Sequence, residues 1–406
     1  MSGAMSWPFL RLYMLALLYF SANALLNVII PLQGAAWGAR STTIGLVMGA
    51  YMLTTMFFRP WAGQLIQKHG PVKVLRLILL VNGAALILYT FTGIGGYVLA
   101  RILQGVATAF FSMALQIGII DALPEKERSQ GISFYSLFSY IPGIIGPVFA
   151  LSLWQANGMD AFTVILISIA VCTGVFGYTV KMEKEPNTGE KSSDSFGVMA
   201  SFGQIVKNPH LFKCSVLMLS ASIIFGAVTT FMPLYGAQLN SGSAGIYLML
   251  QAAVVVASRV LLRKRIPSDG RWHSSFIMGT MLLITLASAC ISLSSAKGAI
   301  LLYAGAILMG AAQALLYPTL TTYLSFVLPS ANRNVLIGLF IATADLGVSM
   351  GGALMGPISD YYSYSTMYFI CAILGIVMIV FSYERRKSSD ESVIRVDSND
   401  GPSTKG

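Results

Sequence analysis

The chain has 406 residues, of which 55% are apolar and only 10% are charged. Because a water-soluble domain carries roughly 25% charged residues, this composition excludes an ordinary soluble surface. The net charge of +10 would suit a nucleic-acid-binding protein. The basic residues are, however, concentrated in short segments between long apolar stretches, which is typical of a membrane protein, and we expect no nucleic-acid partner.

Twelve apolar stretches long enough to cross a bilayer follow one another along the chain. A spanning helix needs roughly 20 predominantly apolar residues. Helices are favoured because a lipid-facing backbone must satisfy its own hydrogen bonds, and the alternation typical of a membrane β-barrel is not seen. We expect spans near residues 7–30, 43–65, 73–92, 96–119, 131–153, 161–180, 212–236, 244–262, 274–294, 299–326, 335–356 and 365–384.

Basic residues are distributed unequally between the two sets of connecting loops. If the chain begins in the cytoplasm, the outer loops contain only Arg40 and Lys297, and all the other loop lysines and arginines lie inside. This asymmetry follows the positive-inside rule and predicts that both termini are cytoplasmic.

Several sequence features of the first half recur in the second half, in the same order and at nearly the same offset. Six-span repeats of this kind form one transporter architecture, in which the substrate site lies near the middle of the membrane between the repeats. The recurring pairs are Arg59 and Arg259, Gly70 and Gly270, Leu123-Pro124 and Leu328-Pro329, and Gly146-Pro147 and Gly356-Pro357.

This repeat predicts an all-α integral membrane protein with twelve transmembrane helices in two pseudo-symmetric six-helix bundles. The polar composition between the sixth and seventh spans indicates a linker, and the polar end of the chain indicates disorder. The expected units are an N-terminal bundle at 1–182, a cytoplasmic linker at 183–208, a C-terminal bundle at 209–386 and a disordered cytoplasmic tail at 387–406.

Nothing in the sequence predicts an enzyme, a cofactor or a resident metal. The three histidines, His69, His210 and His273, lie at expected cytoplasmic helix ends, and no pair has metal-ligand spacing. A phosphate-binding Gly-x-x-x-x-Gly-Lys-Ser/Thr loop is absent, which excludes ATP as an energy source within this chain. No acid, base and nucleophile come together near one membrane interface, as an enzyme would require.

Two charged residues lie well inside expected spans. Arg101 is the deepest basic residue, and Asp345 is the one acid near the middle of a span. A charge at the bilayer centre costs roughly 2.5–3.5 kcal/mol on insertion scales, so such residues usually face a water-filled cavity or a partner. Arg101 could hold a substrate carboxylate, take part in proton coupling, or tie helices together. Asp345 could carry protons, bind a substrate amine, or have a purely structural role.

Polar residues recur at helical spacing in the first, fourth, seventh and tenth spans. Asparagine cannot carry a proton, so proton coupling through the first span is disfavoured. Such stripes either offer hydrogen bonds to a polar solute or join neighbouring helices. We predict substrate binding by Tyr19, Asn23, Asn27, Arg101, Gln104, Thr229, Gln313 and Tyr317, and proton coupling by Asp345 and Arg101.

Three motifs resemble those of the major facilitator superfamily. The segment 63–70 resembles the loop signature Gly-x-Leu-x-Asp-Arg-x-Gly, although Gln67 replaces the acid. The fourth span matches Arg-x-x-Gln-Gly from Arg101, and the fifth partly matches the Gly-x-x-x-Gly-Pro motif of antiporter-type exporters. The resemblance covers roughly residues 7–385 and implies alternating access through a cavity lined by the first, fourth, seventh and tenth helices.

The same resemblance implies a set of gating residues. In place of the missing acid, Asp121 at the end of the fourth span could pair with Arg59 or Lys68. The gating set is Arg59, Gly63, Lys68, Gly70, Asp121, Gly146 and Pro147.

A closer resemblance is to the staphylopine exporters. It is carried by the segments 58–63, 266–273, 317–321 and 344–360. It implies a monomeric exporter in the bacterial cytoplasmic membrane whose partners are the lipid bilayer, protons and a small-molecule substrate. The cargo would be a metal-free opine-type metallophore, an amino-acid-derived zwitterion with several carboxylates and amines, exported by proton-coupled antiport. Broad drug efflux within the same superfamily is the alternative.

Overall fold

The twelve expected spans are confirmed as helices in a computed structural model, and no strand occurs in the residues that it describes. Those residues are 3–91, 93–156, 158–180, 203, 205–262, 265–267, 269–329 and 333–383. The helices are α1 (Trp7–Ala36), α2 (Ser41–His69), α3 (Pro71–Phe91), α4 (Ile94–Ala122), α5 (Glu125–Gln155), α6 (Met159–Thr179), α8 (Pro209–Gln238), α9 (Ala244–Leu261), α10 (Ser274–Lys297), α11 (Ala299–Val327), α12 (Arg333–Tyr361) and α13 (Tyr364–Ser382).

Most of the helices are longer than the apolar stretches that predicted them. Helix α2 continues through the polar residues Gln64, Gln67 and Lys68 to His69, and α1 continues past Pro31 to Ala36. A helix keeps its backbone hydrogen bonds where its side chains become polar, so hydropathy alone underestimates its length. The expected tail, and the expected linker apart from residues 203 and 205–208, lie outside the described residues.

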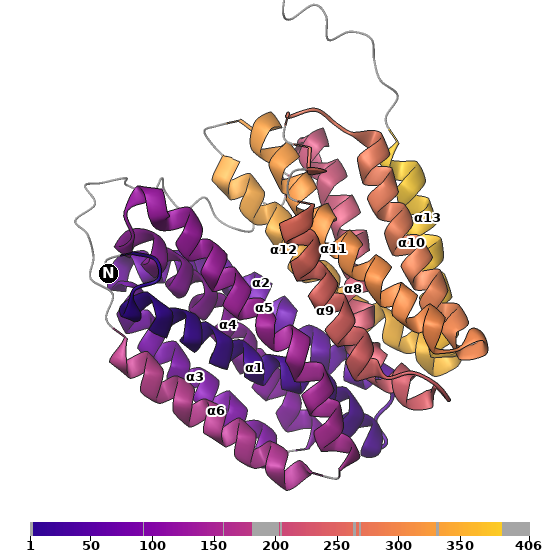
Figure 1. Ribbon diagram of the computed structural model, residues 1–406, viewed down its shortest axis with the longest axis horizontal. Helices are drawn as coiled ribbons and strands as arrows, with labels where there is room; N and C mark the ends of the chain where they lie inside the picture. Colours follow the sequence, from indigo (N-terminus) through magenta and orange to yellow (C-terminus); the bar gives the residue numbers. More distant parts are fainter. Residues whose placement is uncertain are drawn as a thin grey trace, which may run out of the picture.

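The helices gather into two bundles, α1–α6 and α8–α13, which lie side by side (Figure 1). We call the side that carries residues 3–6 and Tyr383 the terminal face, and the side that carries residues 37–40 and 361–363 the loop face. In Figure 1 the two bundles lie close together at the loop face and farther apart at the terminal face. Two helix pairs make most of the contacts between bundles: α2 with α12, and α5 with α9.

Glycines bring α2 and α12 into backbone contact. A methyl group on Gly45 would collide with the backbone of Gly352, and one on Gly49 would lie 2.7 Å from the carbonyl oxygen of Ser349. On another face of α12, Gly347 and Gly351 pack equally closely on α8. Small residues permit such approach in membranes, where van der Waals packing is a main source of helix association.

The seam between α5 and α9 repeats this arrangement. An added methyl on Gly245, 200 positions after Gly45, would lie 3.1 Å from the carbonyl oxygen of Pro147. Toward the terminal face each seam ends at an arginine: Arg59 pairs with Asp345 at 2.8 Å, and the Arg259 guanidinium lies 4.6 Å from the centre of the Tyr140 ring. The sequence repeat therefore corresponds to a repeat of the contacts between bundles.

One glycine of the repeat also has a conformational role. Gly70 alone connects α2 to α3, and it has a φ of 82°, while its counterpart Gly270 has a φ of 73°. A side chain disfavours positive φ, so both positions favour glycine.

We predict that Gly45→Ala destabilises the protein, because its methyl group has no space beside Gly352. Overpacking of this kind costs about 1–3 kcal/mol. The matched control is Gly174→Ala, since no atom of the described residues outside its own helix backbone lies within 4 Å of a methyl group added there, and the change should be neutral or slightly stabilising. Thermal unfolding of the detergent-purified variants compares them; equal midpoints would contradict the tight seam.

Candidate functional site

Arg101 on α4 is the centre of a polar cluster inside the first bundle, and its side chain is 0% exposed. One terminal nitrogen, Nη1, donates to Asn23 Oδ1 at 3.0 Å and to Gln104 Oε1 at 3.2 Å. The other, Nη2, donates to Asn27 Oδ1 at 2.9 Å. The structure therefore brings together four of the predicted binding residues, from α1 and α4.

All of these acceptors are neutral. Among the described residues no carboxylate forms an ion pair with Arg101, and its Nε is buried without a hydrogen-bond partner. Amide oxygens offset part of the cost of burying a cation but do not neutralise it. The cluster therefore favours the approach of an anion, and a guanidinium binds carboxylates with matching two-pronged geometry.

Three residues of this cluster were not predicted. Nη2 of Arg101 lies 3.2 Å from Met48 Sδ, and the guanidinium lies 5.3 Å from the centre of the Tyr51 ring. Tyr89 donates to Gln104 Oε1 at 3.0 Å. All three lie on α2 and α3, outside the four spans whose polar stripes predicted the site. Tyr51 stands at helical spacing with Thr55 and Arg59, and that stripe could have found it.

Tyr19 is buried in the packing of the first bundle, like Arg101 itself. Its hydroxyl bonds to that of Thr108 at 2.9 Å, and its ring stacks on Phe111 with centroids 3.7 Å apart. The hydroxyl of Tyr51 donates to the same Thr108 oxygen at 3.1 Å. These contacts join α1, α2 and α4 behind the Arg101 cluster.

In the second bundle Gln313 forms a smaller polar group with Gln251, while Tyr317 and Thr229 make separate contacts. Gln251 Nε2 donates to Gln313 Oε1 at 3.2 Å, and the Oε1 atom of Gln251 is buried without a partner among the described residues. Tyr317 packs on Phe340, and the hydroxyl of Thr229 bonds to a carbonyl of its own helix. No hydrogen bond links these residues to the Arg101 cluster within the described chain.

Equivalent glycines place the two polar groups at corresponding positions. An added methyl on Gly105 would lie 2.5 Å from the carbonyl oxygen of Tyr51, and one on Gly310 would lie 2.5 Å from that of Gln251. The Tyr51–Thr108 pair of the first half thus corresponds to the Gln251–Gln313 pair of the second. The cation has no such counterpart, because its cluster lies in the first bundle alone.

Asp345 joins the two bundles, and this corrects one expectation. The partner of Arg59 is Asp345, with side chains 33% and 13% exposed, rather than Asp121. Arg59 lies ten residues before the end of α2, about 15 Å along the axis, whereas Asp121 lies in the last turn of α4. Among the described residues Asp121 forms no ion pair with Lys68 either.

The Arg59–Asp345 pair links α2 of the first bundle to α12 of the second. Tyr51, whose ring centre lies 5.3 Å from the Arg101 guanidinium, stands on α2 about two helical turns before Arg59.

Three of the other predicted gating residues, Gly63, Gly146 and Pro147, lie at helix contacts. An added methyl on Gly63 would lie 3.5 Å from Met113 on α4, and one on Gly146 would lie 2.7 Å from the Cβ of Ala24 on α1. The backbone of Pro147 meets Gly245 in the α5–α9 seam. Lys68 is exposed on the last turn of α2.

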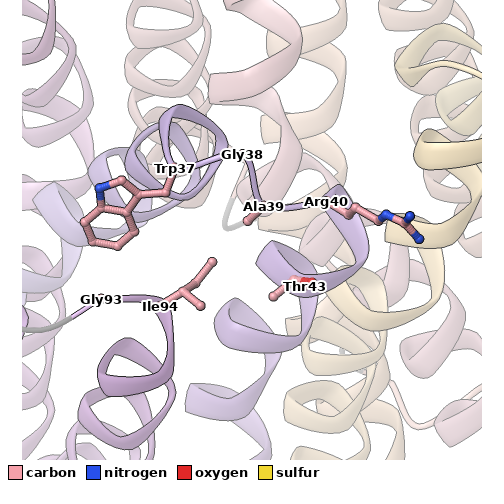
Figure 2. Close-up of a pocket in the computed structure, with 7 residues that line it drawn as sticks. All are labelled: Trp37, Gly38, Ala39, Arg40, Thr43, Gly93 and Ile94. Carbon is pink, nitrogen blue, oxygen red and sulfur yellow. The ribbon is translucent and has the colours of Figure 1, made fainter.

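An open recess of about 680 Å³ on the loop face is separate from this site. It is lined by Trp37, Gly38, Ala39, Arg40, Thr43, Gly93 and Ile94. Figure 2 shows Trp37 and Arg40 pointing to opposite sides, so their polar atoms do not converge on a ligand. In the part of the chain that the structure describes, no three potential metal ligands gather.

Comparisons with known proteins agree with this architecture. A model of the Major Facilitator Superfamily matches residues 12–274 and 267–398. The staphylopine export protein of Staphylococcus aureus is 55% identical over 388 residues, which cover 95% of this chain and 98% of that protein.

Solved structures show the same fold at low sequence identity. A bacterial homologue of the human lysosomal transporter Spinster, in an inward-facing and occupied conformation, has a TM-score of 0.74 at 11% identity, over 92% of this chain and 95% of that one. The nucleoside transporter NupG has a TM-score of 0.70 at 15% identity, over 94% of this chain and 100% of that one.

We predict that Asn27→Asp stabilises the protein, because it places a carboxylate beside an unneutralised guanidinium. Hydrogen bonds to charged groups contribute about 1.5–3 kcal/mol. The control is Asn82→Asp, since Asn82 is buried on α3 and neither of its side-chain polar atoms is hydrogen-bonded within the described residues; that change should destabilise. The two variants should shift the midpoint of thermal unfolding in opposite directions, and a fall in both would argue against an unneutralised Arg101.

Proposed function

The chain belongs to the major facilitator superfamily, and we propose that it exports a metal-free, staphylopine-type metallophore by proton-coupled alternating access. The observation that carries this proposal is the buried, unneutralised Arg101 in a chain 55% identical to a staphylopine export protein. The polar lining supports a hydrophilic cargo over the drugs of a broad efflux pump, which would favour an aromatic lining.

Arg101 would receive a carboxylate of the cargo. The amides of Asn23 and Asn27 now orient the guanidinium through their oxygens, and their NH2 groups could donate to a second carboxylate. A cargo amine would find acceptors at Gln313, Tyr317 or Asp345. A bound metal would occupy the same carboxylates and amines, which supports transport of the metal-free form.

The distribution of charge supports cytoplasmic termini. On the terminal face the described residues include Lys68, Lys73, Arg76, Lys126 and Lys213, whereas the loop face carries Arg40 and Lys297. With this orientation, the seams close the extracellular side, and the site of the present conformation would be reached from the cytoplasm, as loading of an export cargo requires.

Asp345 would couple transport to protons. Its ion pair with Arg59 crosses the seam between bundles, so opening of the loop face must break it. Protonation of Asp345 removes the negative charge and weakens that pair. The energy is sufficient, since moving one charge through 100 mV yields about 2.3 kcal/mol, more than a tenfold solute gradient.

Arg101→Ala should abolish export, because the cargo loses its carboxylate partner. Metabolites secreted under metal starvation are compared between a deletion strain and the same strain carrying each variant at matched membrane levels. Arg76→Ala is the control, since Arg76 bonds the carbonyl of Tyr178 at the edge of the first bundle and should export normally. Normal export by Arg101→Ala would overturn the binding role, and secretion of unrelated drugs alone would favour broad efflux.

Asp345→Asn should remove the response to a pH gradient while leaving cargo exchange at equal pH. Asparagine keeps the shape of the side chain but carries no titratable proton. The purified protein is reconstituted into liposomes, and uptake of labelled cargo is measured with and without a pH gradient. Unchanged gradient-driven transport would reduce Asp345 to a structural residue.

A further inference from the structure

Asp360, in the last turn of α12, binds the first turn of α2 across the two bundles. Its Oδ1 accepts from the backbone N–H of Ser41 at 2.7 Å. Its Oδ2 accepts from the backbone N–H and the hydroxyl of Thr42, at 2.9 and 2.6 Å. A carboxylate of the second half thus caps a helix of the first half at the loop face.

The cap satisfies a need that α2 does not meet by itself. The first N–H groups of a helix lack partners within it and attract negative charge. The residue before α2 is Arg40, which gives no side-chain cap. In the equivalent helix of the second half, α9, Ser243 caps its own helix by accepting from the N–H of Ile246. The two halves therefore differ at corresponding positions, and of these two helices only α2 takes its cap from the opposite bundle.

Asp360 also completes one face of α12. Asp345, Ser349, Gly352, Gly356 and Asp360 are spaced four, three, four and four residues apart, which places them on one side of the helix. This is the side that meets α2: the glycines allow backbone contact, and an acid stands at each end. Gly356 brings the chain against Ser41 and Thr42, so the carboxylate reaches their N–H groups.

We propose that Asp360 is the latch of the loop face, a positioning residue that sets how often this face opens during transport. The charge-assisted bonds exist only while α2 and α12 are together. Each opening must therefore break these bonds and replace them with bonds to water. This inference rests on the proposed alternating access, and it adds a gate on the face opposite the predicted gating loop at 63–70.

The rate at which a buried seam residue becomes accessible tests the latch. Ser349→Cys is made in a background without the four native cysteines, and a membrane-impermeant maleimide is added from the loop face. The side chain of Ser349 is buried against α2, so labelling reports opening. Asp360→Asn should raise the labelling rate at least tenfold, equivalent to about 1.4 kcal/mol. Thr42→Val, which removes one hydroxyl and keeps the backbone, should raise it less.

Asp160→Asn is the matched control, because Asp160 is also an exposed acid on the loop face but lies in the first turn of α6. It should leave labelling unchanged. Parental rates in both Asp360→Asn and Thr42→Val would overturn the latch while leaving alternating access intact. If the introduced thiol fails to react in every variant, even with acid outside, the loop face does not open, and both the latch and the proposed function fail.

Discussion

A guanidinium that is fully buried and whose hydrogen-bond partners among the described residues are all neutral is the feature on which this account depends. Arg101 is ordered by Asn23, Asn27 and Gln104, and no carboxylate of the described chain neutralises it. Burial of a charge is tolerated in a membrane protein when it faces a cavity or a partner. The unneutralised charge therefore supports a site completed by an anionic cargo, in which the amides fix the position of the cation in advance and lower the ordering cost of binding.

The packing between the bundles explains how such a site could be exposed to one side at a time. Contacts without intervening side chains, as at Gly45 and Gly352, leave little room for partial opening, so a seam of this kind is either closed or separated. The charged contacts stand at its ends: Arg59 with Asp345 near the polar groups, and Asp360 with the start of α2 at the loop face. A change in the charge of Asp345 or of Asp360 can therefore shift the whole seam between its closed and its separated state.

The sequence predicted the helices and much of the cluster, for physical reasons that also explain what it missed. Membrane length and hydropathy determine spans, and helical spacing placed Asn23 and Asn27 on the face that meets Arg101. Tyr51, Tyr89 and Gln251 were missed because they lie on α2, α3 and α9, outside the four spans whose polar stripes predicted the site, and they acquire their role by packing. The partner of Arg59 was wrongly assigned because depth along α2, rather than the motif, decides which acid its side chain can reach. The roles of Thr229, Gln313 and Tyr317 stay predictions.

The central claim is that Arg101 binds a carboxylate of a metal-free cargo. Isothermal titration calorimetry tests it most directly. Metal-free staphylopine and its zinc-loaded form are each titrated into the purified parent protein and into Arg101→Ala. The account predicts that the metal-free form binds the parent protein, that loading with zinc weakens binding, and that Arg101→Ala loses at least about 100-fold in affinity, near 2.7 kcal/mol. Equal affinity of Arg101→Ala and the parent for the metal-free form would contradict it.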